Sequence, residues 1–454
     1  MALHLYEMND KKIALDVNSG SVHVVDELTF EALGLIETSS KEEAKSSLKL
    51  KYKEKEADID ELFSEIDELI ENELLYADDI YGKYADNTVG QVVKALCLHV
   101  AHDCNLACNY CFASQGEYKG CAELMSLEVG KKALDYLVKA SKNRRNLDVD
   151  FFGGEPLMNW EVVKELVAYG RSIEKENNKN FRFTITTNGV LLDEEKIDFI
   201  NEHMHNVVLS LDGRKTVNDL MRPFRNGKGS YDLIVPKFQR LVEKRGQKDY
   251  FIRGTFTRHN LDFAEDVVHY KELGFDITSL EPVVTDPKMD YAIREEDLPK
   301  VLNEYEKLSE LYIDMKKDNP NFTFYHFVAD LNQGPCVIRK ITGCGAGSSY
   351  LAVTPKGDLY PCHQFVDNSD FKLGDVDSGI INKKIVEDFS KVNVYSKPEC
   401  SDCWAKFYCS GGCMANAFHA NGDVTKPYKV GCEMEKKRIE CALSVTAKLG
   451  EDSE

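Results

Sequence analysis

Three cysteines in the stretch CNLACNYC have a spacing that suits an iron–sulfur cluster. They are Cys104, Cys108 and Cys111, separated by three and then two residues. Each iron of a four-iron, four-sulfur cluster takes one thiolate, so three cysteines leave one iron without a protein ligand. An open iron can bind a substrate, and the triplet therefore predicts a catalyst rather than a simple electron carrier.

The alternative for these residues is a zinc site or a pair of structural thiols. Structural zinc takes four nitrogen or sulfur ligands, and the nearby His99 and His102 are candidates to complete such a set. The residues further along the chain favour the cluster.

The triplet, with Tyr110 before its last cysteine, resembles the signature of radical S-adenosylmethionine (radical SAM) enzymes. The resemblance implies that the open iron chelates the amino and carboxylate groups of SAM. It also implies that an electron from the cluster splits SAM into methionine and a 5'-deoxyadenosyl radical, which takes a hydrogen atom from the substrate. Tyr110 would then lie beside the SAM adenine, although packing is the more common role of an aromatic residue.

The motif Gly153-Gly154-Glu155-Pro156 follows a predicted strand at 148–152. Glycines let the backbone approach a ligand without interference from a Cβ atom, and a carboxylate accepts hydrogen bonds from an ammonium group. The motif resembles the GGEP sequence that contacts the SAM amino group in this family. An ordinary strand-to-helix turn is the alternative.

Further candidates for SAM binding lie near later strand ends. By resemblance to peptide-modifying members of the family, Ser210 and Asn188 hold the methionine or ribose part of SAM. Arg222 or Arg253 is expected to pair with the SAM carboxylate, because a guanidinium fork matches that group. A surface ion pair is the alternative for either arginine.

Two carboxylates complete this set of candidates. Asp212 and Glu281 are predicted at the ends of strands, and Asp212 is included among the cofactor-binding residues. Acids in such places can take part directly in the chemistry. The alternative is that each fixes only the local backbone.

Seven more cysteines lie near the C-terminus. Twelve residues separate Cys344 from Gly357, and four residues separate Gly357 from Cys362. The remaining cysteines are Cys400, Cys403, Cys409, Cys413 and Cys432. The order and gaps reproduce the seven-cysteine pattern of the SPASM domain, whereas a zinc ribbon needs only two pairs. The resemblance implies two auxiliary [4Fe-4S] clusters and therefore three clusters in the whole protein.

The same resemblance divides these cysteines between the two auxiliary clusters. The ligands of the first, a fully ligated electron relay, are Cys400, Cys403, Cys409 and Cys432. The assigned ligands of the second are Cys344, Cys362 and Cys413.

The fourth ligand of the second auxiliary cluster is an open question. In sulfatase-maturing relatives it lies a few residues before the position of Cys344, but here the nearest upstream cysteine is Cys336, eight residues away. Those relatives also have an acidic residue after the position of Cys362, and here it is His363. Either Cys336 completes the cluster or one iron is free to bind a substrate thiolate. Iron lowers the pKa of a thiol, and a nearby carbon radical could then join the sulfur while the cluster accepts the extra electron.

The elements that must position these residues alternate along the chain. Strand patterns occur at 96–101, 148–152, 181–187, 206–211, 250–257 and 276–283, and amphipathic helix patterns such as 126–142, 159–177 and 262–273 lie between them. Repeated strand–helix units predict a parallel sheet, which places chemistry at the carboxyl ends of its strands. Six units resemble the partial (β/α)6 barrel of radical SAM enzymes, an α/β fold.

The first 86 residues have a different character. Strands are predicted at 2–8, 11–17 and 21–25, followed by helices at about 27–36, 41–48 and 58–74. This order suits a winged-helix-like α+β module. The segment has 9 Lys, no Arg and 22 Asp plus Glu, a formal charge of −13. It resembles the recognition domain of ribosomal peptide maturases, in which a leader peptide adds a strand to a sheet edge. A structural cap on the barrel is the alternative.

We therefore expect four parts in this chain. They are a recognition domain at 1–86, the partial barrel at 87–294, a helical bridge at 295–335 and the SPASM domain at 336–454. From residue 336 onward we expect many turns and few long periodic segments, and we expect the last dozen residues to be frayed.

Composition excludes several classes of protein. The 454 residues have a net charge of −20, which lacks the basic footprint of a nucleic-acid-binding protein. The sequence has no apolar run of about 18 residues for a membrane span and no signal-peptide pattern, so we expect a cytoplasmic protein. Fourteen cysteines in that compartment indicate metal or redox chemistry rather than disulfides.

Taken together, the motifs resemble most closely the maturases of six-cysteines-in-forty-five (SCIFF) peptides. This implies an enzyme that joins a cysteine to a carbon of a threonine, forming a thioether in a cysteine-rich ribosomal precursor peptide. It also implies a reductant such as flavodoxin or ferredoxin. The alternatives are a SPASM maturase that makes carbon–carbon links or formylglycine, a non-catalytic iron–sulfur electron carrier or peptide-binding module, and a zinc-dependent structural protein.

Overall fold

The computed structural model describes residues 3–88, 92–116, 118, 120, 122–329, 331 and 336–451. Its largest feature is a curved sheet whose central strands are parallel neighbours in chain order. They are β4 (Ala95–His102), β6 (Asn146–Gly153), β7 (Asn180–Thr187), β8 (Asn206–Ser210), β9 (Phe251–Phe256) and β10 (Ile277–Pro282). Each of the six predicted strands is present within two residues of its expected ends.

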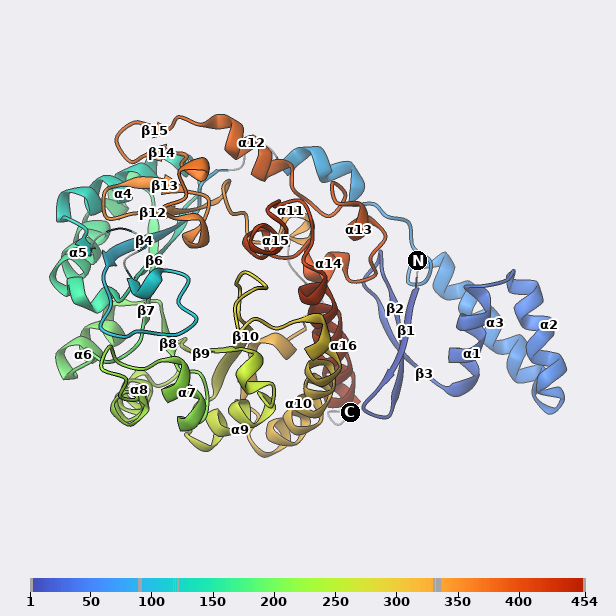
Figure 1. Ribbon diagram of the computed structural model, residues 1–454. Coiled ribbons are helices and arrows are strands. Elements are labelled where there is room, and N and C mark those ends of the chain that lie inside the picture. The colour runs from blue at the N-terminus through green and yellow to red at the C-terminus, as the bar shows by residue number, and fades with distance from the viewer. Residues whose placement is uncertain are drawn as a thin grey trace.

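Helices cover the outer side of this sheet, as Figure 1 shows. They are α4 (Leu127–Ala140), α5 (Trp160–Asn177), α6 (Glu194–His203), α7 (Lys215–Met221), α8 (Tyr231–Arg245) and α9 (Ala264–Glu272). Side chains alternate across a strand, so Val149 and Phe151 of β6 join the apolar core under the helices, whereas Asp150 hydrogen-bonds to Thr186 of β7 on the other face. The result is the predicted partial α/β barrel, with polar residues inside.

Strands from the C-terminal half extend the same sheet at both ends. The short strand β11 (Thr323–Phe324) pairs with β10, and β12 (Tyr350–Val353) pairs in parallel with β4. The antiparallel strands β13 (Asp358–Tyr360), β14 (Gly374–Asp375) and β15 (Gly379–Ile380) follow, and β5 (Glu123–Leu124) pairs with β4. The cysteine-rich region is therefore continuous with the barrel sheet rather than only attached to it.

The helix α16 (Lys429–Glu451) has 23 residues and overturns, as far as residue 451, the expectation that the chain is frayed from residue 443. It is a long regular element in a segment expected to be rich in turns. Leu443 and Val445 are buried, so the helix is held by packing beside α10 (Leu298–Asp318) and is not frayed from residue 443. Shorter helices of this region are α11 (Val337–Thr342), α12 (Lys383–Lys391), α13 (Pro398–Ser401), α14 (Lys406–Cys409) and α15 (Met414–Asn421).

The N-terminal module contains the three predicted strands and three predicted helices. They are β1 (Leu3–Met8), β2 (Lys11–Asp16), β3 (Val22–Val25), α1 (Glu27–Ile36), α2 (Lys41–Lys51) and α3 (Glu56–Glu71). The sheet is antiparallel with the order β1-β2-β3. The sheet side of the module faces α16 while its helices project outward (Figure 1). His4 of β1 contacts Glu440 of α16 at 2.9 Å and stacks on Trp404.

Within the described ranges, every helix is too short or too polar to span a lipid bilayer.

Candidate functional site

The loop that follows β4 carries Cys104, Cys108 and Cys111. Backbone hydrogen bonds from Ala107 to Pro223 and from Asn109 to Met221, at the end of α7, hold the loop in place. Burial, together with the charges of neighbouring cysteines, raises the pKa of Cys104 to about 12 and that of Cys108 to about 11. Thiolates crowded in this way need positive charge between them, which the irons of a cluster provide.

The two glycines of the GGEP motif pack against this loop. A Cβ atom on Gly153, whose φ is +132°, would lie 2.1 Å from the Ala101 carbonyl oxygen, and one on Gly154 would lie 2.1 Å from the Asp103 carbonyl oxygen. The Gly154 and Glu155 amides donate to those same oxygens, at 2.7 and 2.8 Å. Glycine is therefore required because the end of β6 touches the cluster loop and fixes its position.

Glu155 is fully buried, and its carboxylate accepts three hydrogen bonds from the protein. The donors are the Leu157 amide at 3.0 Å, the Thr187 hydroxyl at 2.8 Å and the Asn188 amide at 2.8 Å. Burial raises its pKa to about 7, against the effect of these bonds. The side chain thus joins the ends of β6 and β7, and its contact with the SAM amino group stays a prediction.

The other predicted SAM contacts lie at or near the ends of strands. Asn188 donates to the Asn105 side-chain oxygen at 2.7 Å and lies 3.6 Å from the Cys104 sulfur. Ser210 ends β8 and is in register with Arg253 of β9, whose side chain is exposed. Asn188 therefore lies at the cysteine loop, whereas Ser210 and Arg253 form a second position on the sheet.

Tyr110, Asp212 and Arg222 form a buried triad. The Tyr110 hydroxyl donates to the Asp212 carboxylate at 2.6 Å and accepts from Arg222 Nη1 at 2.7 Å. Burial raises the pKa of Asp212, and the Arg222 charge opposes that rise. Asp212 also accepts from the Thr255 amide at 3.0 Å, so it fixes the backbone of β9. The triad ties the cysteine loop to β8 and β9.

Replacing Arg222 with methionine should destabilise the protein strongly. The substitution leaves the buried Asp212 without a cation, and breaking a buried pair in this way costs about 3–5 kcal/mol. Urea unfolding of the metal-free protein measures the loss. Arg240→Met removes an arginine whose ion pairs with Glu194 and Glu243 are exposed, and it should cost less than about 1 kcal/mol. Equal losses for the two variants would contradict the structural role of the triad.

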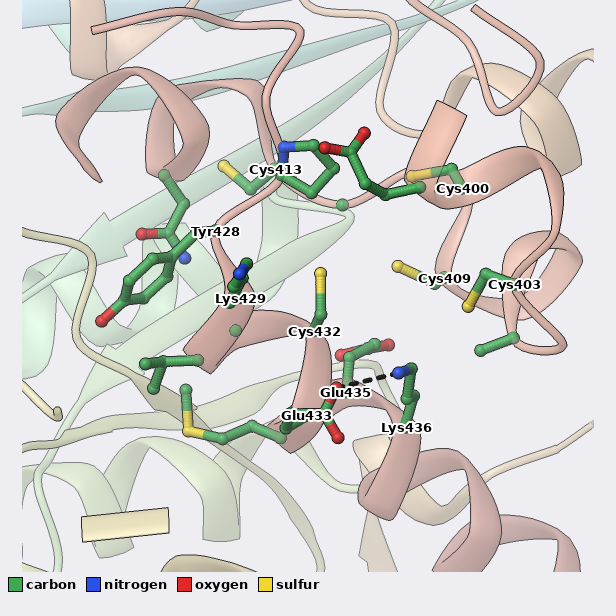
Figure 2. Close-up of a pocket in the computed structure, with 18 of the residues that line it drawn as sticks. Cys400, Cys403, Cys409, Cys413, Tyr428, Lys429, Cys432, Glu433, Glu435 and Lys436 are labelled. Carbon is green, nitrogen blue, oxygen red and sulfur yellow. Dashed lines mark hydrogen bonds and ion pairs between the residues drawn. The ribbon is translucent and has the colours of Figure 1, made fainter. Parts of the chain in front are cut away.

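A cavity of about 950 Å³ lies between the barrel and the C-terminal cysteines. The sulfurs of Cys400, Cys403, Cys409 and Cys432 gather on one side of it, and Cys413 lies apart on the other (Figure 2). Burial raises the pKa of Cys409 to about 12 and that of Cys432 to about 11, and charges of the other cysteines add to both effects. The structure thus brings together the four predicted ligands of the first auxiliary cluster.

The predicted ligands of the second auxiliary cluster also meet. Burial raises the pKa of Cys362 and of Cys413, and the charge of Cys344 contributes to both. Cys336 is different. It immediately precedes α11, whereas Cys344 follows the other end of that six-residue helix, about 9 Å along its axis. A negative charge on Cys336 raises the pKa of Lys94, which burial lowers.

The arrangement of thiols bears on the zinc alternative. In the part of the chain that the structure describes, no three His, Cys, Asp or Glu side chains converge on one metal ion. Zinc needs all its ligands within about 2.3 Å of a single ion, whereas cluster thiolates each bind a different iron. His99 and His102 hydrogen-bond to each other at 3.1 Å. The geometry disfavours a mononuclear zinc site at the triplet.

Two residues inside the barrel escaped the sequence analysis. Arg438 of α16 donates to His326 Nδ1 at 3.0 Å and lies 3.4 Å from the Glu281 carboxylate. Burial alone would raise the pKa of Glu281, but the neighbouring His326 and the charges of Arg438 and Arg253 hold it at about 2. Glu281 is therefore part of an ionic network between β10 and α16. The only sequence signal was a charged pair, Glu435 and Arg438, on the helix that carries Cys432.

Comparisons with known proteins agree with this geometry. Residues 98–252 match the Radical SAM superfamily, and residues 344–404 match SPASM, an iron-sulfur cluster-binding domain. The chain combines a radical SAM domain with a SPASM domain. The first match covers the barrel from β4 to β9, and the second begins at Cys344 and ends just after Cys403.

Two relatives illustrate how far the sequence similarity extends. An uncharacterized protein of Methanocaldococcus jannaschii is 31% identical over 192 residues, which is 41% of this chain and 63% of that protein, less than two thirds of its length. A cysteine-type anaerobic sulfatase-maturating enzyme of Clostridium novyi is 26% identical over 340 residues, covering 69% of this chain and 86% of that enzyme.

Solved structures share the fold at lower identity. The anSMEcpe structure with bound AdoMet aligns over 79% of this chain and 100% of its own, with 20% identity and a TM-score of 0.65. Streptococcus suis SuiB bound to its precursor peptide SuiA aligns over 95% of this chain and 98% of its own, with 16% identity and a TM-score of 0.52. The SuiB alignment extends over nearly all of this chain.

The residues present suit the cofactors that these domains imply, which are [4Fe-4S] clusters and SAM. The triplet offers three thiols and the SPASM region offers two further groups. Buried polar atoms without a hydrogen-bond partner in the described structure include Arg222 Nε and Asn105 Nδ2. Such orphaned donors are costly unless a ligand satisfies them, and both belong to residues that contact the predicted SAM site.

Proposed function

We propose that this protein installs an intramolecular thioether between a cysteine and a threonine of a ribosomally made, cysteine-rich precursor peptide. When bound, the [4Fe-4S] cluster at the triplet would supply the electron that splits SAM into methionine and a 5'-deoxyadenosyl radical, and an auxiliary cluster with an open iron would offer a place for a thiolate and accept an electron. The protein must therefore hold SAM, the peptide sulfur and the acceptor carbon together inside the barrel.

The observation that carries the proposal is the ligand set of the second auxiliary site. The charges of Cys344 and Cys413 act on Cys362, whereas Cys336 lies at the far end of α11 from Cys344. A site with three thiols has room for a fourth from the substrate, and a bound thiol ionises readily. His363, next to Cys362, packs against Phe112 and Phe152, so this part of the SPASM domain adjoins the cysteine loop of the barrel.

The N-terminal module is proposed to bind the leader of the precursor. Its strand β3 has β2 on one side and no strand partner on the other among the described residues, and Val24 is 43% exposed. A peptide can extend such an edge through backbone hydrogen bonds. The formal charge of −13 favours a leader that is neutral or cationic.

Replacing Val24 with proline should weaken leader binding at least tenfold. Proline removes a backbone donor but is tolerated on edge strands. Val24→Ala keeps the donor and is the matched control, for which we expect an affinity close to that of the wild type. Fluorescence anisotropy with a labelled leader peptide measures the dissociation constants. If the proline variant bound the leader as tightly as the wild type, β3 would not be the edge to which the leader binds.

The proposed function is tested by anaerobic reconstitution with iron, sulfide, SAM, dithionite and a cysteine-rich peptide encoded beside the gene. A thioether makes the product lighter by two hydrogens and protects one thiol from alkylation. Tandem mass spectrometry should place the link between a cysteine and a threonine. A peptide that keeps all its thiols while 5'-deoxyadenosine accumulates would contradict thioether formation.

Formylglycine formation is the second candidate, because the C. novyi relative is named as a cysteine-type sulfatase-maturating enzyme. The same reaction separates the candidates, since conversion of cysteine to formylglycine removes sulfur from the peptide, whereas a thioether retains it. His363 after Cys362 and the distant Cys336 favour the thioether.

A further inference from the structure

Lys397 is a buried lysine beside the auxiliary cysteines. Its side chain is only 2% exposed. Its backbone carbonyl accepts hydrogen bonds from the Cys400 and Ser401 amides at 2.9 and 3.0 Å, so the residue caps the helix α13. Its ammonium donates to the Gly411 carbonyl oxygen at 2.7 Å, and Gly411 lies between Cys409 and Cys413 in the chain. Lys397 thus connects the segment that carries Cys400 with the loop that carries Cys409 and Cys413.

Among the described residues the acceptor of this ammonium is the Gly411 carbonyl oxygen, and the Lys397 charge helps to lower the pKa of the partly exposed Asp423 without an ion pair between them. A buried charge without a partner costs several kcal/mol. The neighbouring Lys406 shows the usual solution, because its buried ammonium pairs with Asp79 at 2.9 Å. Lys397 therefore calls for an anionic partner that the protein chain alone does not provide.

The groups around Lys397 identify that partner. Burial lowers its pKa, while the charges of Cys400, Cys409, Cys432 and Cys413 raise it. Three of these cysteines belong to the first auxiliary site and Cys413 belongs to the second. Thiolates bound to iron carry the negative charge that the ammonium requires, and the nearby charge sets the potential of an iron–sulfur cluster.

We infer that Lys397 is the built-in counter-cation of the two auxiliary cluster sites and stabilises their one-electron-reduced state. This inference rests on the proposed function, which puts a cluster at each site. Reduction adds one electron and no proton, and every thiolate stays bound, so the cluster becomes more negative by one charge. A fixed cation between the sites favours that change, which makes the clusters better acceptors for an electron released by the substrate.

The experiment compares the midpoint potentials of the auxiliary clusters in full-length protein. Cys104, Cys108 and Cys111 are replaced with alanine in every sample, so that only auxiliary clusters contribute, and dithionite titration is followed by electron paramagnetic resonance. Lys397→Gln removes the charge but keeps a donor for Gly411. We expect its equilibrium constant for reduction to fall at least tenfold, which is 59 mV for one electron. Lys397→Arg should stay near the wild-type value.

Lys436 provides a matched control. It also lies near Cys403 and Cys432, but it is 33% exposed and paired with Glu433 at 2.8 Å (Figure 2). Solvent screens such a charge, so Lys436→Gln should change the reduction constant less than Lys397→Gln does. An equal or larger change in the Lys436 variant would contradict a special role for Lys397.

Iron and sulfide content separates the remaining outcomes. Loaded Lys397→Gln protein with a wild-type midpoint would overturn the inference and leave the proposed function standing. If Lys397→Gln loses iron, retention of iron by Lys397→Arg supports the role of the charge, and loss in both variants contradicts it. Protein with Lys397 intact that takes up no iron at the SPASM cysteines would contradict the proposed function as well.

Discussion

Cys104→Ala should abolish SAM cleavage. The substitution removes one of the three predicted cluster ligands in the loop after β4, and outer-shell changes alone cost metal sites about 10–100-fold. We therefore expect 5'-deoxyadenosine formation to fall by more than about 100-fold. Liquid chromatography of reactions with SAM and dithionite measures the nucleoside.

Cys97→Ala is the matched control for that experiment. Cys97 lies on β4 and is 1% exposed, like a structural thiol, and it belongs to no predicted cluster. Replacing Cys97 with alanine removes only a buried thiol group from this strand. The variant should therefore cleave SAM at a rate close to that of the wild type. If Cys104→Ala still released the nucleoside at the rate of Cys97→Ala, the assignment of the triplet would be wrong.

Cys413→Ala is the second change with a large expected effect, and it should separate two activities. It removes one of the three thiols at the second auxiliary site, far along the chain from the cysteine loop. We expect the rate of thioether formation to fall by more than about 100-fold, because the loss of a ligand should cost more than the loss of a group that only supports one. SAM cleavage without peptide should continue, because the triplet is unchanged.

The control for Cys413→Ala is Cys441→Ala. Cys441 is buried on α16, where its thiol approaches the Tyr305 carbonyl oxygen at 3.5 Å, and it is assigned to no cluster. Crosslinking should persist in this variant. A Cys413→Ala protein that crosslinks the peptide at the wild-type rate would show that the second auxiliary site does not handle the substrate.

The barrel could be predicted from the sequence because its strands have simple patterns. β6 alternates apolar residues such as Val149 and Phe151 with polar ones, and glycine-rich turns follow. Period-two alternation between turn signals indicates a strand whatever the later context. The cysteine triplet and the SPASM cysteines were equally visible, since their spacing is local information.

Long-range packing could not be predicted in the same way. The pairing of β12 with β4 joins residues about 250 positions apart, and no local pattern signals which strand will be its neighbour. The helix α16 has a mixed surface because it contacts α10, the N-terminal sheet and the barrel interior. Its residues therefore lack the single apolar stripe that indicates a helix in a sequence.

The roles of individual polar residues also depended on the fold. The sequence predicts that Glu155 contacts SAM, and this stays a prediction; the fold adds that its carboxylate also accepts from Leu157, Thr187 and Asn188. No sequence pattern singles out Lys397, and lysine is rarely fully buried. Only the assembled loops show that its ammonium lies among the auxiliary cysteines.

The most direct test of the central claim is the electron paramagnetic resonance spectrum of anaerobically reconstituted, dithionite-reduced protein, recorded with and without SAM. If Cys104, Cys108 and Cys111 hold a [4Fe-4S] cluster with an open iron, SAM should change the spectrum of the wild type, and the change should be absent in Cys104→Ala. A wild-type spectrum that SAM leaves unchanged, or protein that contains no such cluster, would contradict the account.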